Sequence, residues 1–218
     1  ECEPNYIYEA DFGKKRPKPA PAPVLPAEKL DYSRSILGME EAWQITAGSR
    51  EVIVAVVDSG VDVVHPDLKN NIWFNAAEMF GRPGVDDDGN GFVDDVYGWD
   101  FANNRPNAID DNSHGTHCAG IIGAEKNGVG SVGISPKVRI MPLKFLNAQG
   151  SGDTFAAIGA INYAVAMGAR VISNSWGGGG YSSYLDQAIQ TFFNTAERDL
   201  VQVILLFLTN VSDYGAVS

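Results

Sequence analysis

The feature that most constrains the fold is an uninterrupted run of apolar, mostly β-branched residues at positions 52–57. A strand with one solvated face alternates apolar and polar residues, but this run contains no polar position. It therefore predicts a strand that is buried on both faces, as in a parallel sheet covered by helices. This stretch alone favours an α/β fold.

The rest of the chain alternates between strands and helices, as an α/β fold requires. Further strand-like runs lie at 138–141, 171–174 and 203–208. Helical patterns separate them, one beginning after an N-cap at Asp153 and one covering 185–196. We expect the first helix to bury four apolar residues, Phe155, Ile158, Ile161 and Val165. The order predicts a mostly parallel sheet with right-handed crossovers and helices on both faces.

Composition narrows the class of protein. The 218 residues suffice for one domain with a sizeable core. The formal net charge of −11 argues against a nucleic-acid partner, because phosphate binding requires a basic surface. No apolar run approaches the roughly 20 residues of a membrane-spanning helix, so we expect no membrane span. Cys2 and Cys118 cannot build a disulfide framework, and Cys118 is interpreted as a small buried residue.

The first 29 residues differ from the rest of the chain. From position 12 to 26 they carry a basic cluster and prolines at nearly alternate positions, which favours extended chain over a packed core. We interpret residues 1–29 as a linker or as the tail of a pro-segment, with the basic cluster as a candidate cleavage site. Residues 30–218 have the composition of a globular domain.

Two residues suggest acid–base chemistry. Asp58 follows the buried strand directly, where open α/β sheets place their sites, and His114 begins the sequence HGTHCAG. A buried aspartate can fix the tautomer of an imidazole, whose other nitrogen then takes a proton from a hydroxyl. Asp-Ser-Gly at 58–60 also occurs in aspartic proteases, but a second such motif is absent, so that alternative requires a dimer. A zinc site is disfavoured, because no His-Glu-x-x-His motif exists.

The acidic stretch 86–95 predicts a calcium site. Oxygen ligands fall at the first, third, fifth and seventh positions of a calcium loop, namely Asp86, Asp88, Asn90 and the carbonyl of Phe92. The usual glutamate at the twelfth position is missing, so Asp95 or Asp94 would substitute for it. So many neighbouring carboxylates repel one another without a cation.

Four motifs in order resemble those of the subtilisin-like serine proteases, the subtilases. Residues 57–62 with 65–68 are similar to the family's aspartate region, and 114–120 to its histidine region. Residues 150–152 and 173–178 resemble its two substrate-binding segments, so the resemblance covers about 30–208. It implies an α/β serine endopeptidase in which Asp58 orients the imidazole and His114 is the general base.

The resemblance also implies a substrate cleft and further calcium ligands. A protein or peptide substrate in extended conformation would add by backbone hydrogen bonds between two segments, Gly150-Ser151-Gly152 and Ser175-Trp176-Gly177. A pro-segment would be an intramolecular inhibitor, and Glu78 would join the acidic loop in binding Ca²⁺. A second Ca²⁺ site would use Asp67, Asn127 and the carbonyls of Val129 and Ser131.

The resemblance breaks down toward the end of the chain. Subtilases carry their nucleophile in a Gly-Thr-Ser motif, and this sequence has none. Asn210 stands where the oxyanion-stabilising asparagine is expected, and it also begins an Asn-Val-Ser glycosylation sequon. We therefore expect residues 30–218 to be the N-terminal part of a peptidase domain, inactive as given. The alternative is a catalytically dead module that binds peptides. The expected location is extracellular or the secretory-pathway lumen, with the signal lying outside this chain.

Overall fold

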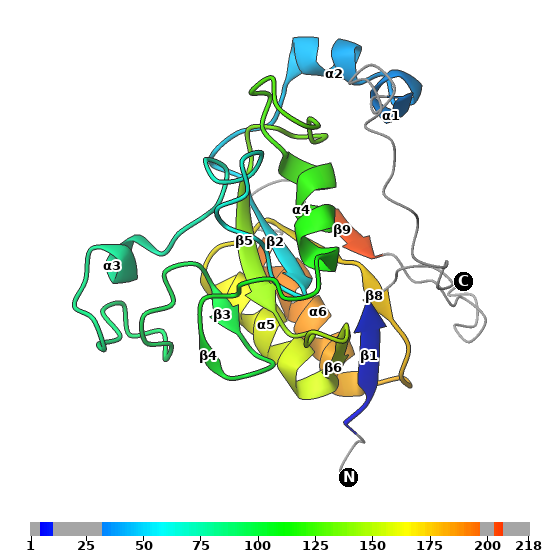
Figure 1. Ribbon diagram of the computed structural model, residues 1–218. Helices are drawn as coiled ribbons and strands as arrows, with labels where there is room; N and C mark the ends of the chain where they lie inside the picture. The colour runs from blue at the N-terminus through cyan, green and yellow to red at the C-terminus, as the bar shows by residue number, and fades with distance from the viewer. Residues whose placement is uncertain (1–4, 11–31, 197–202, 207–218) are drawn as a thin grey trace.

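The computed structural model of the protein describes residues 5–10, 32–196 and, for the backbone, 203–206 (Figure 1). The helices are α1 (Tyr32–Ile36), α2 (Met39–Ile45), α3 (Ala76–Met79), α4 (His114–Gly123), α5 (Thr154–Ala166) and α6 (Ser183–Ala196). The strands are β1 (Ile7–Ala10), β2 (Ile53–Asp58), β3 (Trp99–Asp100), β4 (Arg105–Pro106), β5 (Arg139–Lys144), β6 (Ser151–Asp153), β7 (Val171–Asn174), β8 (Trp176–Gly177) and β9 (Val203–Leu206).

The main sheet has six strands in the order β4-β3-β5-β2-β7-β9. All neighbouring pairs that the structure aligns are parallel except β3 with β4, which is antiparallel. The predicted α/β class with a mostly parallel sheet is therefore confirmed. The apolar run that predicted a doubly buried strand is β2, and every residue of β2 is buried.

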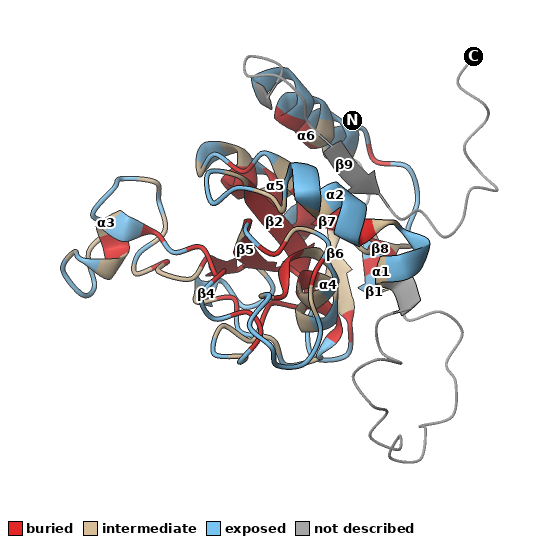
Figure 2. Cartoon of the chain, turned by 90° about the horizontal axis from the view of Figure 1, so that it is seen from above, coloured by how far each residue is buried: buried red, intermediate tan, exposed pale blue. Residues whose placement is uncertain are grey.

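Alternate residues of β2 face the two sides of the sheet and belong to two separate cores. Ala55 and Val57 pack in the larger core, which includes residues of α5 and α6. Val54 and Val56 pack in the smaller core, which includes Ala119 of α4. Figure 2 shows the buried residues gathered along β2 and β5, between the covering helices. Helices thus cover both faces, and the carboxyl end of β2 is fixed from both sides.

Helix α5 begins where the sequence predicted, and three of its four predicted inward residues contact the core. Ile161 is buried, and Ile158 and Val165 pack partly buried against the larger core. The Asp153 side chain accepts a hydrogen bond from the Ala156 N–H and caps the helix. Phe155 is wrong as a core residue, because its side chain is 69% exposed. The helix instead turns a row of small residues and Ile161 toward the sheet, namely Ala157, Ala160, Ile161 and Ala164. Alanines let the helix lie close to the strands, which a row of large side chains would prevent.

Most of the segment 70–113 is irregular. It nevertheless contains the short helix α3 and the two short strands β3 and β4, which extend the main sheet. In Figure 1 the part around α3 projects away from the rest of the molecule. Within the described residues, the helices are too short or too polar to cross a membrane.

Candidate active site

Asp58 and His114 lie in direct contact, as the sequence predicted. Asp58 is the last residue of β2, and its backbone oxygen accepts hydrogen bonds from the N–H groups of Phe145 and Leu146. Its Oδ1 lies 2.8 Å from Nδ1 of His114, the first residue of α4. Both side chains are buried, with Asp58 0% and His114 6% exposed. The sheet and α4 therefore hold the carboxylate and the imidazole in one fixed geometry.

The start of α4 approaches the turn after β2 very closely. A Cβ atom on Gly115 would lie 2.1 Å from the Gly60 carbonyl oxygen, so only glycine fits at position 115. The Gly115 N–H donates to the Ser59 hydroxyl, which in turn donates to Oδ1 of Asp110. Oδ2 of Asp110 accepts from both the N–H and the hydroxyl of Thr116. Asp110 thus ties the start of the histidine helix to the aspartate turn.

The Asp110 carboxyl is ionised in this setting. Burial by itself would raise its pKa, but the hydrogen bonds from Thr116, Asn112 and Ser59 outweigh burial and lower the pKa. Sequence reasoning had not singled out Asp110. Its only signal was its place in an Asp-Asp-Asn-Ser run just before a helix start, where a carboxylate can accept backbone N–H bonds.

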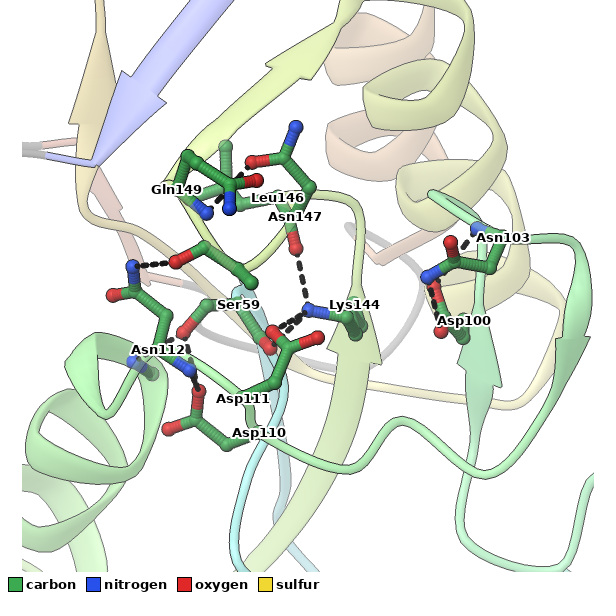
Figure 3. Close-up of polar contacts among 12 residues, drawn as sticks. Ser59, Asp100, Asn103, Asp110, Asp111, Asn112, Lys144, Leu146, Asn147 and Gln149 are labelled. Carbon is green, nitrogen blue, oxygen red and sulfur yellow. Dashed lines mark hydrogen bonds and ion pairs between the residues drawn. The ribbon is translucent and has the colours of Figure 1, made fainter.

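A buried lysine also supports the aspartate turn, and the sequence analysis missed it. Lys144, the last residue of β5, is 0% exposed. Its Nζ donates to the backbone oxygens of Ser59 at 2.9 Å and Leu146 at 2.7 Å, and to Oδ1 of Asp111 at 2.5 Å (Figure 3). Its signal was a cation directly after the apolar residues 140–143, and such a residue is rarely buried without partners.

The environment of His114 raises its pKa. Burial alone would lower the pKa, because it disfavours the imidazolium. The hydrogen bond and the negative charge of Asp58, with a smaller effect of Cys118, outweigh burial and raise the pKa to about 10. Sγ of Cys118 lies 3.9 Å from Nδ1 of His114. Asp58 thus orients the imidazole and stabilises its protonated form, the imidazolium that arises when His114 accepts a proton.

The chain's own N-terminal segment lies between the two segments expected to bind substrate. Strand β1 forms a three-stranded antiparallel sheet with β6 on one side and β8 on the other. Tyr8 is paired with Gly152, and Ala10 with Trp176. The N–H of Ala10 donates to the Gly150 oxygen at 2.7 Å. An extended peptide therefore occupies this cleft by backbone pairing on both edges.

The side chains of β1 alternate between the protein and solvent. Tyr8 is 4% exposed, and its ring meets the Trp176 ring edge-on with centroids 5.1 Å apart. The Trp176 indole is fixed because its N–H donates to the Val57 oxygen at 2.8 Å. Ile7 and Glu9 are exposed. The Tyr8 ring thus packs into the larger core against Trp176, whose indole is bonded to the strand that carries Asp58.

A family model described as the subtilase family matches residues 49–207. The chain belongs to the subtilase family of serine proteases. Membership in this family rules out the aspartic-protease alternative. The contact between Asp58 and His114 also accounts for His114, which that alternative left without a role.

Other subtilases resemble this chain over most of its length. Subtilisin-like protease 1 of Plasmodium vivax is 36% identical over 187 residues, which are 84% of this chain and 28% of that protein. Thermitase of Thermoactinomyces vulgaris is 37% identical over 164 residues, 75% of this chain and 50% of that protein. Fervidolysin from Fervidobacterium pennivorans, a keratinolytic enzyme related to subtilisin, has a crystal structure that matches with a TM-score of 0.60 at 28% identity. The match covers 88% of the present chain and 29% of the fervidolysin chain. The present chain therefore spans half or less of the length of these relatives.

The acidic loop of this subtilase brings three predicted calcium ligands together. Carboxylate oxygens of Glu78, Asp86 and Asp88 lie within 4.8 Å of one another. Glu78 is buried and accepts hydrogen bonds from the N–H groups of Asp87 and Asp94. Asp86 accepts three backbone N–H bonds, and the bond from Gly91, the largest cause, lowers its pKa. The backbone thus gathers negative charge that a Ca²⁺ ion would neutralise.

Asn90 and Asp95 form a neighbouring hydrogen-bond network. Asp95 is 0% exposed and accepts hydrogen bonds from the side chains of Asn75, Asn90 and Tyr163. Burial raises the pKa of Asp95 and, together with the bond to that carboxylate, raises the pKa of Tyr163. The Phe92 ring packs edge-on against Tyr163, with centroids 5.1 Å apart. Asp95 is not one of the three carboxylates that lie within 4.8 Å of one another, but the side chains of Asn75 and Asn90 each donate to both Asp88 and Asp95.

The second predicted calcium site is a loop wrapped around Asp67. Oδ2 of Asp67 accepts from the Ser131 N–H, and Oδ1 of Asn127 accepts from the Val129 N–H. Oδ1 of Asp67 is buried and accepts no hydrogen bond from the described residues. A buried carboxylate oxygen without a donor is costly, and a bound cation would remove that cost. The donor set of carboxylate, amide and carbonyl oxygens also fits Ca²⁺.

Ser175 and Asn210 were also predicted as site residues. Ser175 lies between β7 and β8, next to the Trp176 that contacts Tyr8. The proposed oxyanion residue, Asn210, lies outside the described residues, as do the basic cluster and most of the proline-rich segment.

Proposed function

We propose that this subtilase is a serine endopeptidase of the subtilisin type, in which Asp58 and His114 form the acid–base pair. The observation that carries the proposal is the buried hydrogen bond between them, beside a cleft that holds an extended peptide. Asp58 accepts the Nδ1–H, which leaves Nε2 to take the proton of an attacking serine hydroxyl. The same nitrogen then gives this proton to the leaving amine, and water completes the acyl transfer.

Labelling with a fluorophosphonate tests this proposal, because the reagent modifies activated serines. We expect the full-length protein to gain one label by intact mass, and His114→Ala to lose it. We expect no label on the 218-residue sequence alone, since it has no Gly-Thr-Ser motif. If the full-length protein also resists labelling but binds peptides, it is the peptide-binding module that the sequence left as an alternative.

We further propose that the segment containing β1 is an inhibitory pro-segment. Its strand occupies the position of an extended substrate between β6 and β8, which a plain linker has no reason to do. Because the segment is tethered, its effective concentration at the cleft is on the order of millimolar, enough to exclude substrates that bind weakly. Substrates are accordingly proteins or peptides with an exposed extended stretch.

Replacing Tyr8 with alanine should release β1 from the cleft. The substitution removes the side chain that packs on Trp176 but no backbone group. We expect hydrogen exchange at the Ala10 amide to accelerate by at least about 100-fold, because the strand then opens without global unfolding. Ile7→Ala is the matched control, since Ile7 is 57% exposed, and should change exchange little. Equal exchange in Tyr8→Ala and the parent would contradict the inhibitory assignment.

We also propose that Ca²⁺ stabilises the fold at the acidic loop and at Asp67. A cation that binds only the folded state stabilises it by about 2.7 kcal/mol at 100 times its Kd. Chelation should therefore lower Tm by roughly 5–10 °C for a domain of this size. Glu78→Gln should reduce this difference, because one buried ligand charge is lost. Glu51→Gln, at an exposed position, should retain it in full. Identical melting curves with and without Ca²⁺ would rule out both sites.

We propose that the protein acts outside the cell or in the lumen of the secretory pathway. The Asn-Val-Ser sequon at 210–212 supports such a location. Occupancy of that sequon, measured by mass before and after deglycosylation, tests the location.

A further inference from the structure

Backbone contact between the N-terminal segment and the cleft continues beyond β1. The Tyr6 N–H donates to the Thr154 hydroxyl at 2.9 Å, and the Tyr6 oxygen accepts from the Thr154 N–H at 2.9 Å. Thr154 is 4% exposed and is the first residue of α5, so its position is fixed. The cleft therefore holds residue 6 as firmly as it holds residues 7–10.

The Tyr6 side chain lies against bare backbone. A Cβ atom on Gly180 would lie 2.7 Å from Cε1 and Cζ of the Tyr6 ring. A Cβ on Gly179 would lie 3.0 Å from Cβ of Tyr6 and 3.2 Å from Cε1 of Tyr8. Gly179 has a positive φ of 69°, so its own conformation favours glycine. Gly180 has no positive φ, so its glycine is explained by the room that the ring takes.

Tyr6 and Tyr8 share one face of the extended segment. Residues two apart in a strand point to the same side, and both of these side chains pack against the larger core. Ile7 and Glu9, on the opposite side, are exposed. The inward-facing side chains at positions 6 and 8 therefore determine which peptide sequences fit the cleft. The outward-facing side chains at positions 7 and 9 contribute little.

We propose that the cleft has a second aromatic subsite, formed by Thr154, Gly179 and Gly180, which selects an aromatic residue two positions before the one held by Trp176. The inference rests on the proposed peptidase function and names the substrate class of that site. Preferred substrates are extended peptides with aromatic residues at two alternate positions, those of Tyr6 and Tyr8.

Peptide binding to the Tyr8→Ala variant of the 218-residue chain tests the subsite, because we expect the N-terminal segment of this variant to leave the cleft. The probes are labelled peptides with the sequence of residues 5–10, unchanged or carrying Tyr6→Ala or Ile7→Ala. We expect the Tyr6→Ala peptide to bind about tenfold more weakly than the unchanged one, as the loss of a half-buried aromatic side chain implies. The Ile7→Ala peptide should bind within about twofold, because that side chain faces solvent.

A second substitution in the protein tests the glycine backbone. Gly180→Ala in the same chain should reduce the tenfold ratio between the unchanged and Tyr6→Ala peptides to about one. If the two peptides bind equally to the Tyr8→Ala chain that retains Gly180, the proposed subsite is wrong, although the proposed peptide cleft still holds. Failure of every peptide to bind would overturn the proposed peptide cleft itself, and the subsite with it.

The otherwise unchanged chain gives an independent measurement. Tyr6→Ala should accelerate hydrogen exchange at the Ala10 amide, and Gly180→Ala should do the same. The double variant should show little more than either single change, because both remove one contact. Additive effects would contradict the subsite.

Discussion

Asp58→Asn should reduce the peptidase activity of the full-length protein by about four orders of magnitude, while the fold remains intact. Asparagine matches aspartate in size, so the packing at the end of β2 is retained. It carries no negative charge to stabilise the imidazolium, and its amide NH2 group can donate to Nδ1 and favour the wrong imidazole tautomer. The variant should unfold cooperatively, and kcat should fall far more than KM changes. Asp186→Asn, exposed in the first turn of α6, is the control and should retain activity.

The same variant should change the titration of His114. In the parent chain, the charge and hydrogen bond of Asp58 raise the pKa of His114 to about 10 against the opposing effect of burial. Without that charge, the pKa of His114 should fall, because burial still lowers it and only Cys118 still raises it. An NMR titration of the His114 ring can follow this change. An unchanged His114 pKa in Asp58→Asn would contradict the assignment of Asp58 as its partner.

The raised pKa of His114 determines the pH range in which the Asp58–His114 pair stabilises the fold. A histidine whose pKa is higher in the folded state than in the unfolded state binds its proton more tightly when folded. Its contribution is complete below pH 6.5 and is lost as pH rises toward 10. The stability difference between parent and Asp58→Asn, measured by urea unfolding, should therefore be larger at pH 5.5 than at pH 9.5. A stability difference that increases with pH would contradict a raised His114 pKa in the folded state.

Features encoded in short stretches were predictable from the sequence. The apolar run before Asp58 could bury both faces only in the middle of a covered sheet, and β2 lies there. The place of Asp58 at a strand end and of His114 at a helix start followed from the same local patterns. The acidic loop was predictable for a similar reason, since Asp86 and Asp88 are close in sequence and need no tertiary contact to meet.

Features that depend on distant segments were not predictable. Nothing in residues 7–10 alone distinguishes a strand from a linker, because β1 exists only by pairing with residues more than 140 positions away. Similarly, Phe155 fitted an amphipathic pattern, but α5 is apolar on several sides, so periodicity could not select the buried face. Asp95 shows the same limit, because its hydrogen bond from Tyr163, far along the chain, has no signal in the acidic stretch itself.

Lys144→Met should destabilise the chain by roughly 2–4 kcal/mol, because two buried carbonyl oxygens lose their donor. Methionine retains most of the side-chain volume, so no large cavity contributes. Asp111 is 43% exposed and can be solvated by water, so the loss comes mainly from the oxygens of Ser59 and Leu146. Tm should fall by about 5–15 °C for a domain of this size. Lys137→Met, at an exposed position, is the matched control and should change Tm by less than about 2 °C.

The Lys144→Met variant also tests whether Lys144 positions the acid–base pair in addition to stabilising the sheet. Ser59 follows Asp58 directly, and its hydroxyl accepts from the first turn of α4, so the Lys144 bond to the Ser59 oxygen fixes the turn joining both residues. When that bond is lost, the Asp58–His114 hydrogen bond should lengthen, and the His114 pKa should fall toward 6.5 even in the folded fraction. If Lys144→Met lowers Tm but leaves the His114 titration unchanged, the lysine stabilises the sheet without positioning the pair. If both change together, the cation buried beneath the aspartate turn contributes to the geometry of the general base.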